Sequence, residues 1–143
     1  MAAKVLLVDD EAPFVEALSM RLENRGLNVQ VAFSGNECLE KLEKDAHIDV
    51  VILDVKMPGL GGIETLRAVK SAYPLVEVIM LTGHATVESA IEGMKQGALD
   101  FLIKPCNIDL LMAKVKEAYS KKASQEEKIA EARAFNIALR RGD

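Results

Sequence analysis

The sequence has little of what builds a site from cysteines or aromatic rings. It contains two cysteines, no tryptophan and only 4% aromatic residues. Cys38 and Cys106 lie far apart, with no CxxC pair and no His/Cys ligand spacing, so we expect reduced, packed thiols rather than a disulfide or a zinc centre. The few aromatic side chains provide no stacking platform for nucleic-acid bases.

Long apolar runs and an excess of positive charge are also absent. No apolar run exceeds five residues, whereas a membrane helix needs about 20. The run at 5–8 is too short for the core of a secretory signal, so we expect a cytoplasmic protein without a membrane partner. The formal net charge of −4 offers no basic face to a polyanion, which argues against direct binding of nucleic acid.

What the sequence does contain is a regular alternation of short apolar segments and stretches of helical periodicity, in a chain that is 50% hydrophobic. This alternation is typical of an α/β fold with a parallel sheet. Four of the five segments are nearly continuous apolar runs, whereas 28–32 alternates apolar and polar residues, which favours an edge position. The predicted strands are 4–8, 28–32, 48–53, 76–81 and 100–103.

Each connecting stretch carries an apolar stripe at helical spacing, and we expect all five stripes to lie in the core. The stripes are Phe14, Leu18 and Leu22; Leu39 and Leu42; Ile63, Leu66, Val69 and Tyr73; Val87, Ile91 and Met94; Ile108, Leu111, Val115 and Ala118. Glycines after predicted helix ends and polar residues at helix starts mark the boundaries. These are Gly26, Gly97, a Ser34/Glu37 capping box, Thr86 and Asn107.

The residues from about 121 onward differ in composition from the rest and carry no strand signal. We therefore expect 1–120 to form one domain and 121–143 a helical extension of its last helix, or a linker. Continuing the apolar register of that helix lands on Lys122, Gln125 and Asn136 as well as on apolar residues, which weakens a coiled-coil seam. Dimerisation through this segment and a solvated extension both stay open.

Polar side chains follow the strands that are predicted to be parallel. Asp9 and Asp10 come after the first strand, Asp54 after the third, Thr82 after the fourth and Lys104 after the fifth. Ligands of such sheets bind at the carboxyl ends of the strands. Crowded carboxylates favour a divalent cation such as Mg²⁺, and a carboxylate beside it can act as a nucleophile toward phosphorus. Taken singly, each residue could instead cap a helix, start a turn or be solvated.

Four segments carry a family resemblance. Val8–Glu11, Leu53–Gly59, Leu81–Gly83 and Ile103–Pro105 resemble, in order and spacing, the signature blocks of the receiver domain of bacterial two-component response regulators. The resemblance covers roughly residues 3–120. It implies a flavodoxin-like, doubly wound five-stranded parallel sheet of order 2-1-3-4-5 with five helices, which agrees with the edge position of 28–32.

The resemblance also implies the chemistry. Asp54 would accept a phosphoryl group from the phosphohistidine of a sensor histidine kinase. Asp10, Asp54 and the backbone carbonyl of Lys56 would bind Mg²⁺ or Mn²⁺ directly, and Asp9 mainly through water. The chain would then be a phosphoacceptor signalling domain that assists its own phosphorylation and dephosphorylation rather than an enzyme.

Further roles carry over to the other matching positions. Lys104 would form an ion pair with Asp54 and later with the phosphoryl oxygens, and its bond to Pro105 would be cis. Thr82 would hydrogen-bond the phosphoryl group and move toward it, and Phe101 would be the switch aromatic, turning inward in the active state.

Two neighbouring positions vary within the family and modulate dephosphorylation there. They are occupied by Lys56, two residues after Asp54, and by His84, two after Thr82. A lysine beside an acyl phosphate could hold its oxygens or shield it from water, while for His84 a solvated loop residue is favoured over a catalytic role. The sequence does not give the direction of either effect.

Two other functions compete with the phosphorylation switch. A metal-dependent phosphohydrolase with an Asp nucleophile generally needs a second acid two residues on, where this chain has Lys56. A receiver-like module that binds partners without phosphorylation is disfavoured because the acidic, Thr and Lys set is intact. The expected partners are a histidine kinase, a downstream effector protein or attached output domain, and a second copy of the chain. No output segment is recognisable after residue 120, so a stand-alone receiver and part of a longer regulator are both expected alternatives.

Overall fold

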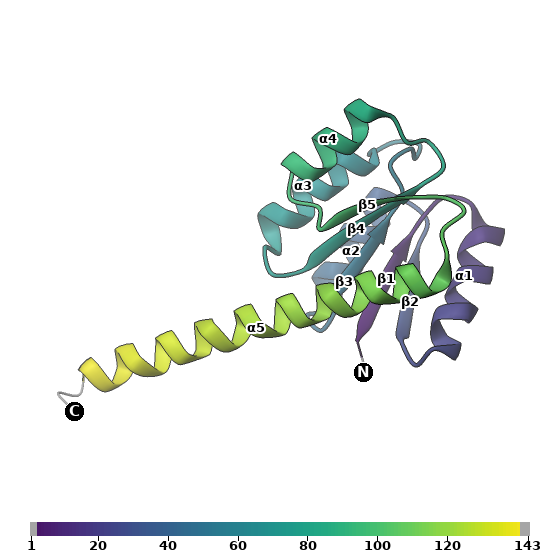
Figure 1. Cartoon of the computed structure of the whole chain (residues 1–143). Coiled ribbons are helices and arrows are strands. Elements are labelled where there is room, and N and C mark those ends of the chain that lie inside the picture. Colours follow the sequence, from purple (N-terminus) through teal and green to yellow (C-terminus); the bar gives the residue numbers. More distant parts are fainter. Residues whose placement is uncertain (1–2, 141–143) are drawn as a thin grey trace.

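A five-stranded parallel sheet forms the centre of the molecule, and the computed structural model describes residues 3–140 (Figure 1). The strand order is β2-β1-β3-β4-β5, as expected. The polar-apolar strand β2 lies at one edge, which confirms the reading of its sequence. The strands are β1 (Lys4–Val8), β2 (Asn28–Ala32), β3 (Val50–Leu53), β4 (Glu77–Thr82) and β5 (Asp100–Ile103).

Helices cover both faces of the sheet. Alternate residues of the buried strands point to opposite faces. Val5 and Leu7 of β1 therefore pack with α1 and α5, while Leu6 and Val8 pack with residues of α2 and α3. The helices are α1 (Ala12–Asn24), α2 (Gly35–Lys44), α3 (Gly62–Ala72), α4 (Val87–Lys95) and α5 (Ile108–Arg140).

Two strand boundaries differ from the sequence prediction. β3 begins at Val50, not at 48, because its pairing with β1 starts at Val5 opposite Val50, while the Asp49 carboxylate accepts a hydrogen bond from the Lys4 backbone N–H at 2.9 Å. β4 runs from Glu77 to Thr82 rather than over 76–81. Apolar runs predict where strands lie but not the residue at which hydrogen bonding to the neighbouring strand begins.

The predicted helix signals act as caps. The Ser34 hydroxyl accepts the Glu37 backbone N–H at 3.1 Å, although the Glu37 carboxylate returns to the N–H of Phe33 rather than to that of Ser34. Thr86 forms a capping box with Ser89, and the Asn107 side chain accepts the Asp109 N–H at 2.7 Å. The two predicted terminating glycines adopt the left-handed conformation that favours glycine, Gly26 at φ 91° and Gly97 at φ 103°.

The expectation that every apolar stripe lies in the core is wrong for α4. Val87, Ile91 and Met94 are 73%, 51% and 47% exposed, and the only fully buried residue of this helix is Gly93. The helix thus packs against the rest of the domain through Gly93, and its apolar stripe faces the surface. Helical periodicity identifies a helix but does not say whether its apolar side meets the sheet or the surface.

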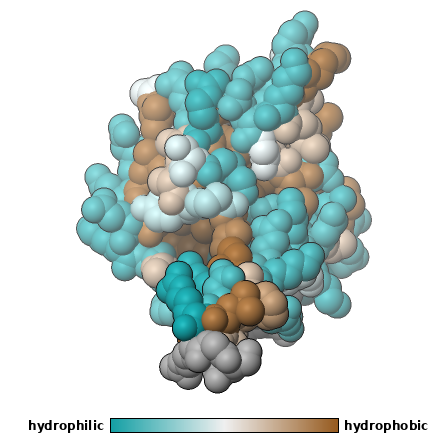
Figure 2. Space-filling model, turned by 90° about the vertical axis from the view of Figure 1, so that its left-hand side faces the viewer, coloured by the Kyte–Doolittle hydropathy of each residue, from teal (hydrophilic) through white to brown (hydrophobic). Residues whose placement is uncertain are grey.

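The last helix confirms the expected extension and continues it well past the sheet. α5 is unbroken over 33 residues, about 50 Å at about 1.5 Å per residue, and its second half projects from the domain (Figure 1). The exposed large apolar residues of this second half are Ile129, Phe135, Ile137 and Leu139. Seen toward its end, the tail shows hydrophilic and apolar surfaces side by side (Figure 2). The residues after 140 lie outside the described part of the chain.

Charged side chains join α5 to the amino ends of the central strands. Glu77, 1% exposed, lies 3.3 Å from the Lys70 ammonium and 3.0 Å from that of Lys121. Its Oε1 atom faces Lys121 as an ion pair but is not aligned for a hydrogen bond. Beside it, the buried Lys122 lies 3.2 Å from Asp49. Lys122, which interrupts the apolar register of the helix, is therefore a buried anchor of α5.

Both cysteines are free thiols, as expected. Cys38 is fully buried in the core, and burial raises the pKa of its thiol to about 12, which makes it unreactive. Cys106 is partly buried against the core layer formed with α1 and α5. Within residues 3–140, no helix combines the length and the apolar character needed to cross a membrane.

Candidate functional site

The carboxyl ends of four adjacent strands bring the predicted polar residues together. Val8 pairs with Leu53, and Thr82 pairs with Ile103. The residues that follow β1, β3 and β5 therefore emerge at one edge, together with the last residue of β4. These residues are Asp9, Asp54, Thr82 and Lys104, as the sequence predicted.

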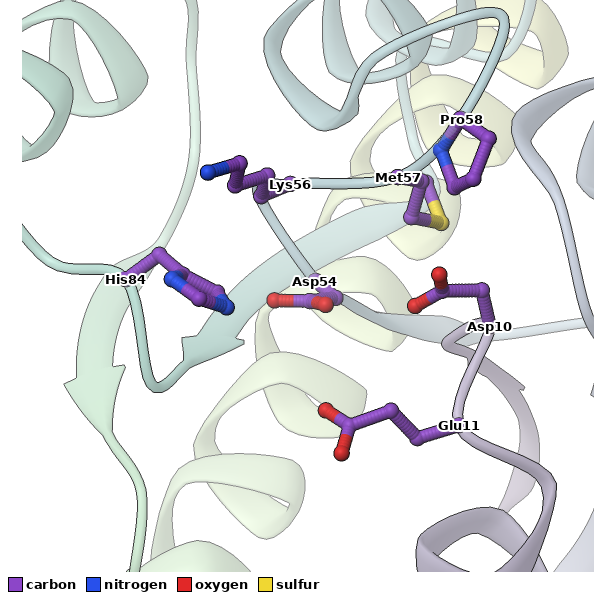
Figure 3. Close-up of a pocket in the computed structure, with 7 residues that line it drawn as sticks. All are labelled: Asp10, Glu11, Asp54, Lys56, Met57, Pro58 and His84. Carbon is purple, nitrogen blue, oxygen red and sulfur yellow. The ribbon is translucent and has the colours of Figure 1, made fainter.

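A pocket of about 410 Å³ opens at this edge (Figure 3). The Asp54 carboxylate lies at its centre, with the carboxylates of Asp10 and Glu11 pointing toward it and the imidazole of His84 on the opposite side. The pocket is lined by Asp10, Glu11, Asp54, Lys56, Met57, Pro58 and His84.

Three carboxylates crowd within this edge. Asp9, Glu11 and Asp54 each offer an oxygen within 4.8 Å of the others. Asp9 and Asp54 are almost fully buried, at 1% and 2% exposure. Burial raises the pKa of Asp54, and the charge of Asp9 adds to that rise, although the Thr82 hydroxyl, the Lys104 charge and the Val55 N–H oppose it. The carboxylates of the site therefore repel one another, and a bound cation would reduce this repulsion.

The donor set fits a hard divalent ion. All the side-chain ligands offered are carboxylate oxygens, two of them buried. Mg²⁺ prefers such oxygens, takes one or two carboxylates and retains several waters. Asp10 is exposed and has its carboxylate in the pocket next to Asp54, but it is not one of the three carboxylates that lie within 4.8 Å of one another.

Lys104 does not pair with Asp54, and this expectation was wrong. Its ammonium donates to Asp9 at 2.5 Å and to Glu11 at 3.3 Å, and it lies 4.1 Å from the centre of the Phe14 ring. Burial alone would lower the pKa of Lys104, but the hydrogen bond to Asp9 and the charges of Asp54 and Asp9 raise it overall. Asp9 captures the lysine because its other oxygen accepts the Glu11 N–H at 3.0 Å, which fixes that carboxylate toward α1 and β5.

The two expected switch residues lie behind the pocket. Thr82 is fully buried, and its hydroxyl accepts the His84 backbone N–H at 3.0 Å. Phe101 is partly buried against the core layer that contains α2 and α3, beside Gly93 of α4. The Lys104–Pro105 peptide bond is cis, as the resemblance implied.

Two residues at the same edge as Asp54 were not assigned from the sequence. Glu11 ends the Val8–Glu11 segment after β1, but its contact with Lys104 depends on β5, which is separated from β1 by two strands. Phe14 was read only as a core residue of α1. Its apolar stripe position gives no signal that its ring also supports a lysine from a distant strand.

Comparisons with known proteins agree with this geometry. The family model described as "Response regulator receiver domain" matches residues 5–116. The transcriptional regulatory protein ZraR of Escherichia coli (strain K12) is 39% identical over 114 residues, which are 80% of this chain and 26% of that protein. The luminescence regulatory protein LuxO of Vibrio campbellii is 33% identical over 115 residues, 80% of this chain and 25% of that protein. The chain thus spans about a quarter of the length of these relatives.

Solved structures match over most of the chain. A response regulator receiver domain protein from Clostridium thermocellum is 38% identical, with a TM-score of 0.82 over 86% of this chain and 98% of that one. NtrX from Brucella abortus is 30% identical, with a TM-score of 0.82 over 91% of this chain and 29% of that one. Both resemble this chain in fold as well as in sequence.

Proposed function

Because the chain belongs to the response regulator receiver family, we propose that Asp54 accepts a phosphoryl group from the phosphohistidine of a sensor histidine kinase. The observation that carries this proposal is the buried Asp54 carboxylate at the centre of the pocket, with acidic side chains and a lysine around it. An Asp54 oxygen attacks phosphorus as the phosphorus–nitrogen bond breaks. The imidazole nitrogen keeps the bonding pair, and an acyl phosphate forms.

The metal that this family uses would be held by residues of this chain. We propose that Asp10, Asp54 and the backbone carbonyl of Lys56 bind Mg²⁺ or Mn²⁺, with Asp9 acting through water. The ion supplies neutralisation of charge on the phosphoryl oxygens. Lys104 turns from its carboxylate partners to the phosphoryl group, and the Thr82 hydroxyl donates a hydrogen bond to it.

The switch would be read on the face of α4, β5 and α5. Several apolar side chains are exposed there: Val87, Ile91, Met94, Ile103 and Leu110. Thr82 lies at the end of β4, and Phe101 of β5 pairs with Met80 of β4 and lies beside Gly93 of α4. We propose that movement of these two residues on phosphorylation changes how this face binds an effector protein or an output domain.

The two variable pocket positions would tune the lifetime of the acyl phosphate. Lys56 and His84 both line the pocket that holds Asp54. A phosphohydrolase function is not favoured, because Lys56 stands where such an enzyme needs its second acid. We propose a phosphoacceptor that assists its own phosphorylation and dephosphorylation without multiple turnover of substrates.

Incubation with acetyl phosphate and Mg²⁺ should add the mass of one phosphoryl group to the protein. Chelation of the metal with EDTA should reduce this labelling at least tenfold, because the acidic pocket would then repel the anionic donor. Intact-mass spectrometry measures both results. Rapid multiple turnover of a phosphomonoester without stable labelling would contradict the proposal and favour the hydrolase.

We also propose that 1–120 is the receiver domain and that 121–143 is a helical extension leading to partners, in a cytoplasmic protein as the two free thiols favour. The apolar residues exposed on the tail would allow a second copy to bind, although exposed hydrophilic residues lie between them in the chain.

The mass of the chain in solution should rise from monomer toward dimer when the phosphoryl mimic beryllofluoride is added with Mg²⁺, if phosphorylation controls this association. Light scattering after size-exclusion chromatography measures it, and the Asp54→Asn protein is the control. An unchanged monomer in both states would exclude the homodimer and favour a different partner for the tail.

A further inference from the structure

The lysine of the site is held by two carboxylates that differ in their surroundings. The Lys104 side chain is 13% exposed and contacts Asp9, whose side chain is 2% exposed. Its second partner, Glu11 at 3.3 Å, has a side chain that is 61% exposed. The buried contact is a fixed part of the core edge, whereas Glu11 is free to change its side-chain conformation at little cost.

Glu11 also contributes charge to the place where a phosphoryl group would form. One of its carboxylate oxygens lies within 4.8 Å of oxygens of Asp9 and Asp54. The side chain reaches over the pocket from the residue that precedes α1, toward the Asp54 carboxylate (Figure 3). It does not cap α1, since it makes no side-chain hydrogen bond at that helix start. Its contact with Lys104 therefore needs another explanation than helix capping.

We propose that Glu11 is a positioning residue that retains Lys104 away from Asp54 in the unphosphorylated protein and so limits the extent of phosphorylation. This inference rests on the proposed function of Asp54. The phosphoryl group on Asp54 requires the same ammonium that Glu11 contacts. Each phosphorylation event must therefore break the Lys104–Glu11 pair and bring further negative charge near the Glu11 carboxylate.

The ion pair between Lys104 and Glu11 favours a role for Glu11 in holding the lysine rather than in binding the metal. Mg²⁺ generally uses only one or two carboxylates, and the chain offers it Asp10 and Asp54. Glu11 is already engaged with a cation that comes from β5. Neutralising Glu11 removes a competitor for Lys104 without removing a metal ligand.

The variant Glu11→Gln should be phosphorylated about two- to fivefold more than the parent at a low, fixed concentration of acetyl phosphate, the size expected of one weak, partly screened ion pair. Intact-mass spectrometry gives the steady-state phosphorylated fraction. Because the effect is electrostatic, the difference between variant and parent should shrink in 1 M salt. Glu16→Gln, an exposed glutamate of α1 outside the pocket, is the matched control and should behave as the parent.

Titration calorimetry with Mg²⁺ separates the competing explanations. A Mg²⁺ affinity within about threefold of the parent supports the proposal when phosphorylation rises. Phosphorylation equal to or lower than that of the parent would overturn it, and a tenfold loss of Mg²⁺ affinity would identify Glu11 as a metal ligand instead. If the parent itself is not labelled, the proposed function fails, and the role of Glu11 fails with it. If the parent is labelled and Glu11→Gln matches it, only the role of Glu11 fails.

Discussion

Replacing Asp54 by asparagine should reduce labelling by acetyl phosphate and Mg²⁺ to below the detection limit of intact-mass spectrometry. The amide nitrogen and oxygen of asparagine are too weakly nucleophilic to attack phosphorus, and the other carboxylates of the pocket do not take over this position. Asp9 is engaged with Lys104, and Asp10 and Glu11 reach the pocket from its side, not from the end of β3 (Figure 3). Labelling of the variant at the level of the parent would show that Asp54 is not the acceptor.

Loss of labelling in this variant should not come from unfolding. The pKa of Asp54 is raised in the folded protein, chiefly because the carboxylate is buried. At pH 7, which lies above the pKa of an aspartate in the unfolded chain, the ionised Asp54 carboxylate therefore destabilises the folded protein. The neutral amide of asparagine removes this destabilisation. The melting temperature of Asp54→Asn should equal or exceed that of the parent. Asp109→Asn, at an exposed aspartate of α5, should be labelled as the parent is.

The second large effect concerns the charges at the opposite edge of the sheet. Changing both Lys70 and Lys121 to methionine should lower the free energy of unfolding by about 3–5 kcal/mol, because it leaves the Glu77 carboxylate buried without a cation. Lys70 also donates to the backbone carbonyls of Pro74 and Val76, and its loss leaves those oxygens short of a donor. Urea denaturation followed by circular dichroism measures the change.

Two further variants test the cause of that loss. Adding Glu77→Met to the double variant should recover much of the stability, since no buried charge is then left. Changing both Lys95 and Lys116 to methionine removes the same number of charges from exposed side chains and should change stability by less than about 1 kcal/mol. If the free energy of unfolding of the Lys70 and Lys121 variant also falls by less than about 1 kcal/mol, the Glu77 carboxylate is adequately solvated without the two lysines.

The ion pairs at the amino ends of the strands fix the direction in which α5 projects from the domain. Lys121 and Lys122 follow each other in the helix and contact Glu77 and Asp49, at the amino ends of β4 and β3. A composition shift near residue 121 was visible in the sequence and was read as the end of the packed domain. The contacts place the first turn of the extension against the sheet, so the change in composition does not coincide with the last residue that packs.

The sequence by itself determined the parallel sheet, the edge position of β2, the helix caps and the edge at which the polar residues meet, while the family resemblance supplied the strand order. The features that the residues themselves predicted depend on local patterns: apolar runs for buried strands, alternation for the edge strand β2, and a polar residue at or directly after the ends of β1, β3, β4 and β5. Because parallel strands end at the same edge, residues far apart in the chain were predicted to converge without any knowledge of their side-chain conformations.

Only the tertiary structure decided which charged groups pair and which apolar faces are buried. The partner of Lys104 depends on competition among three carboxylates within 4.8 Å of one another, and Asp9 holds it because its own orientation is fixed by the Glu11 N–H. The exposure of the α4 stripe depends on Gly93, which carries the contact with Phe101. Periodicity and motifs describe one segment at a time. The pairing of charged groups and the burial of a helix face instead depend on interactions with residues from several strands and helices at once. The scarcity of aromatic and cysteine residues argued against a stacking platform or a zinc centre, but the contacts of Glu11 and Phe14 with Lys104, the residue after β5, decided how this site is arranged.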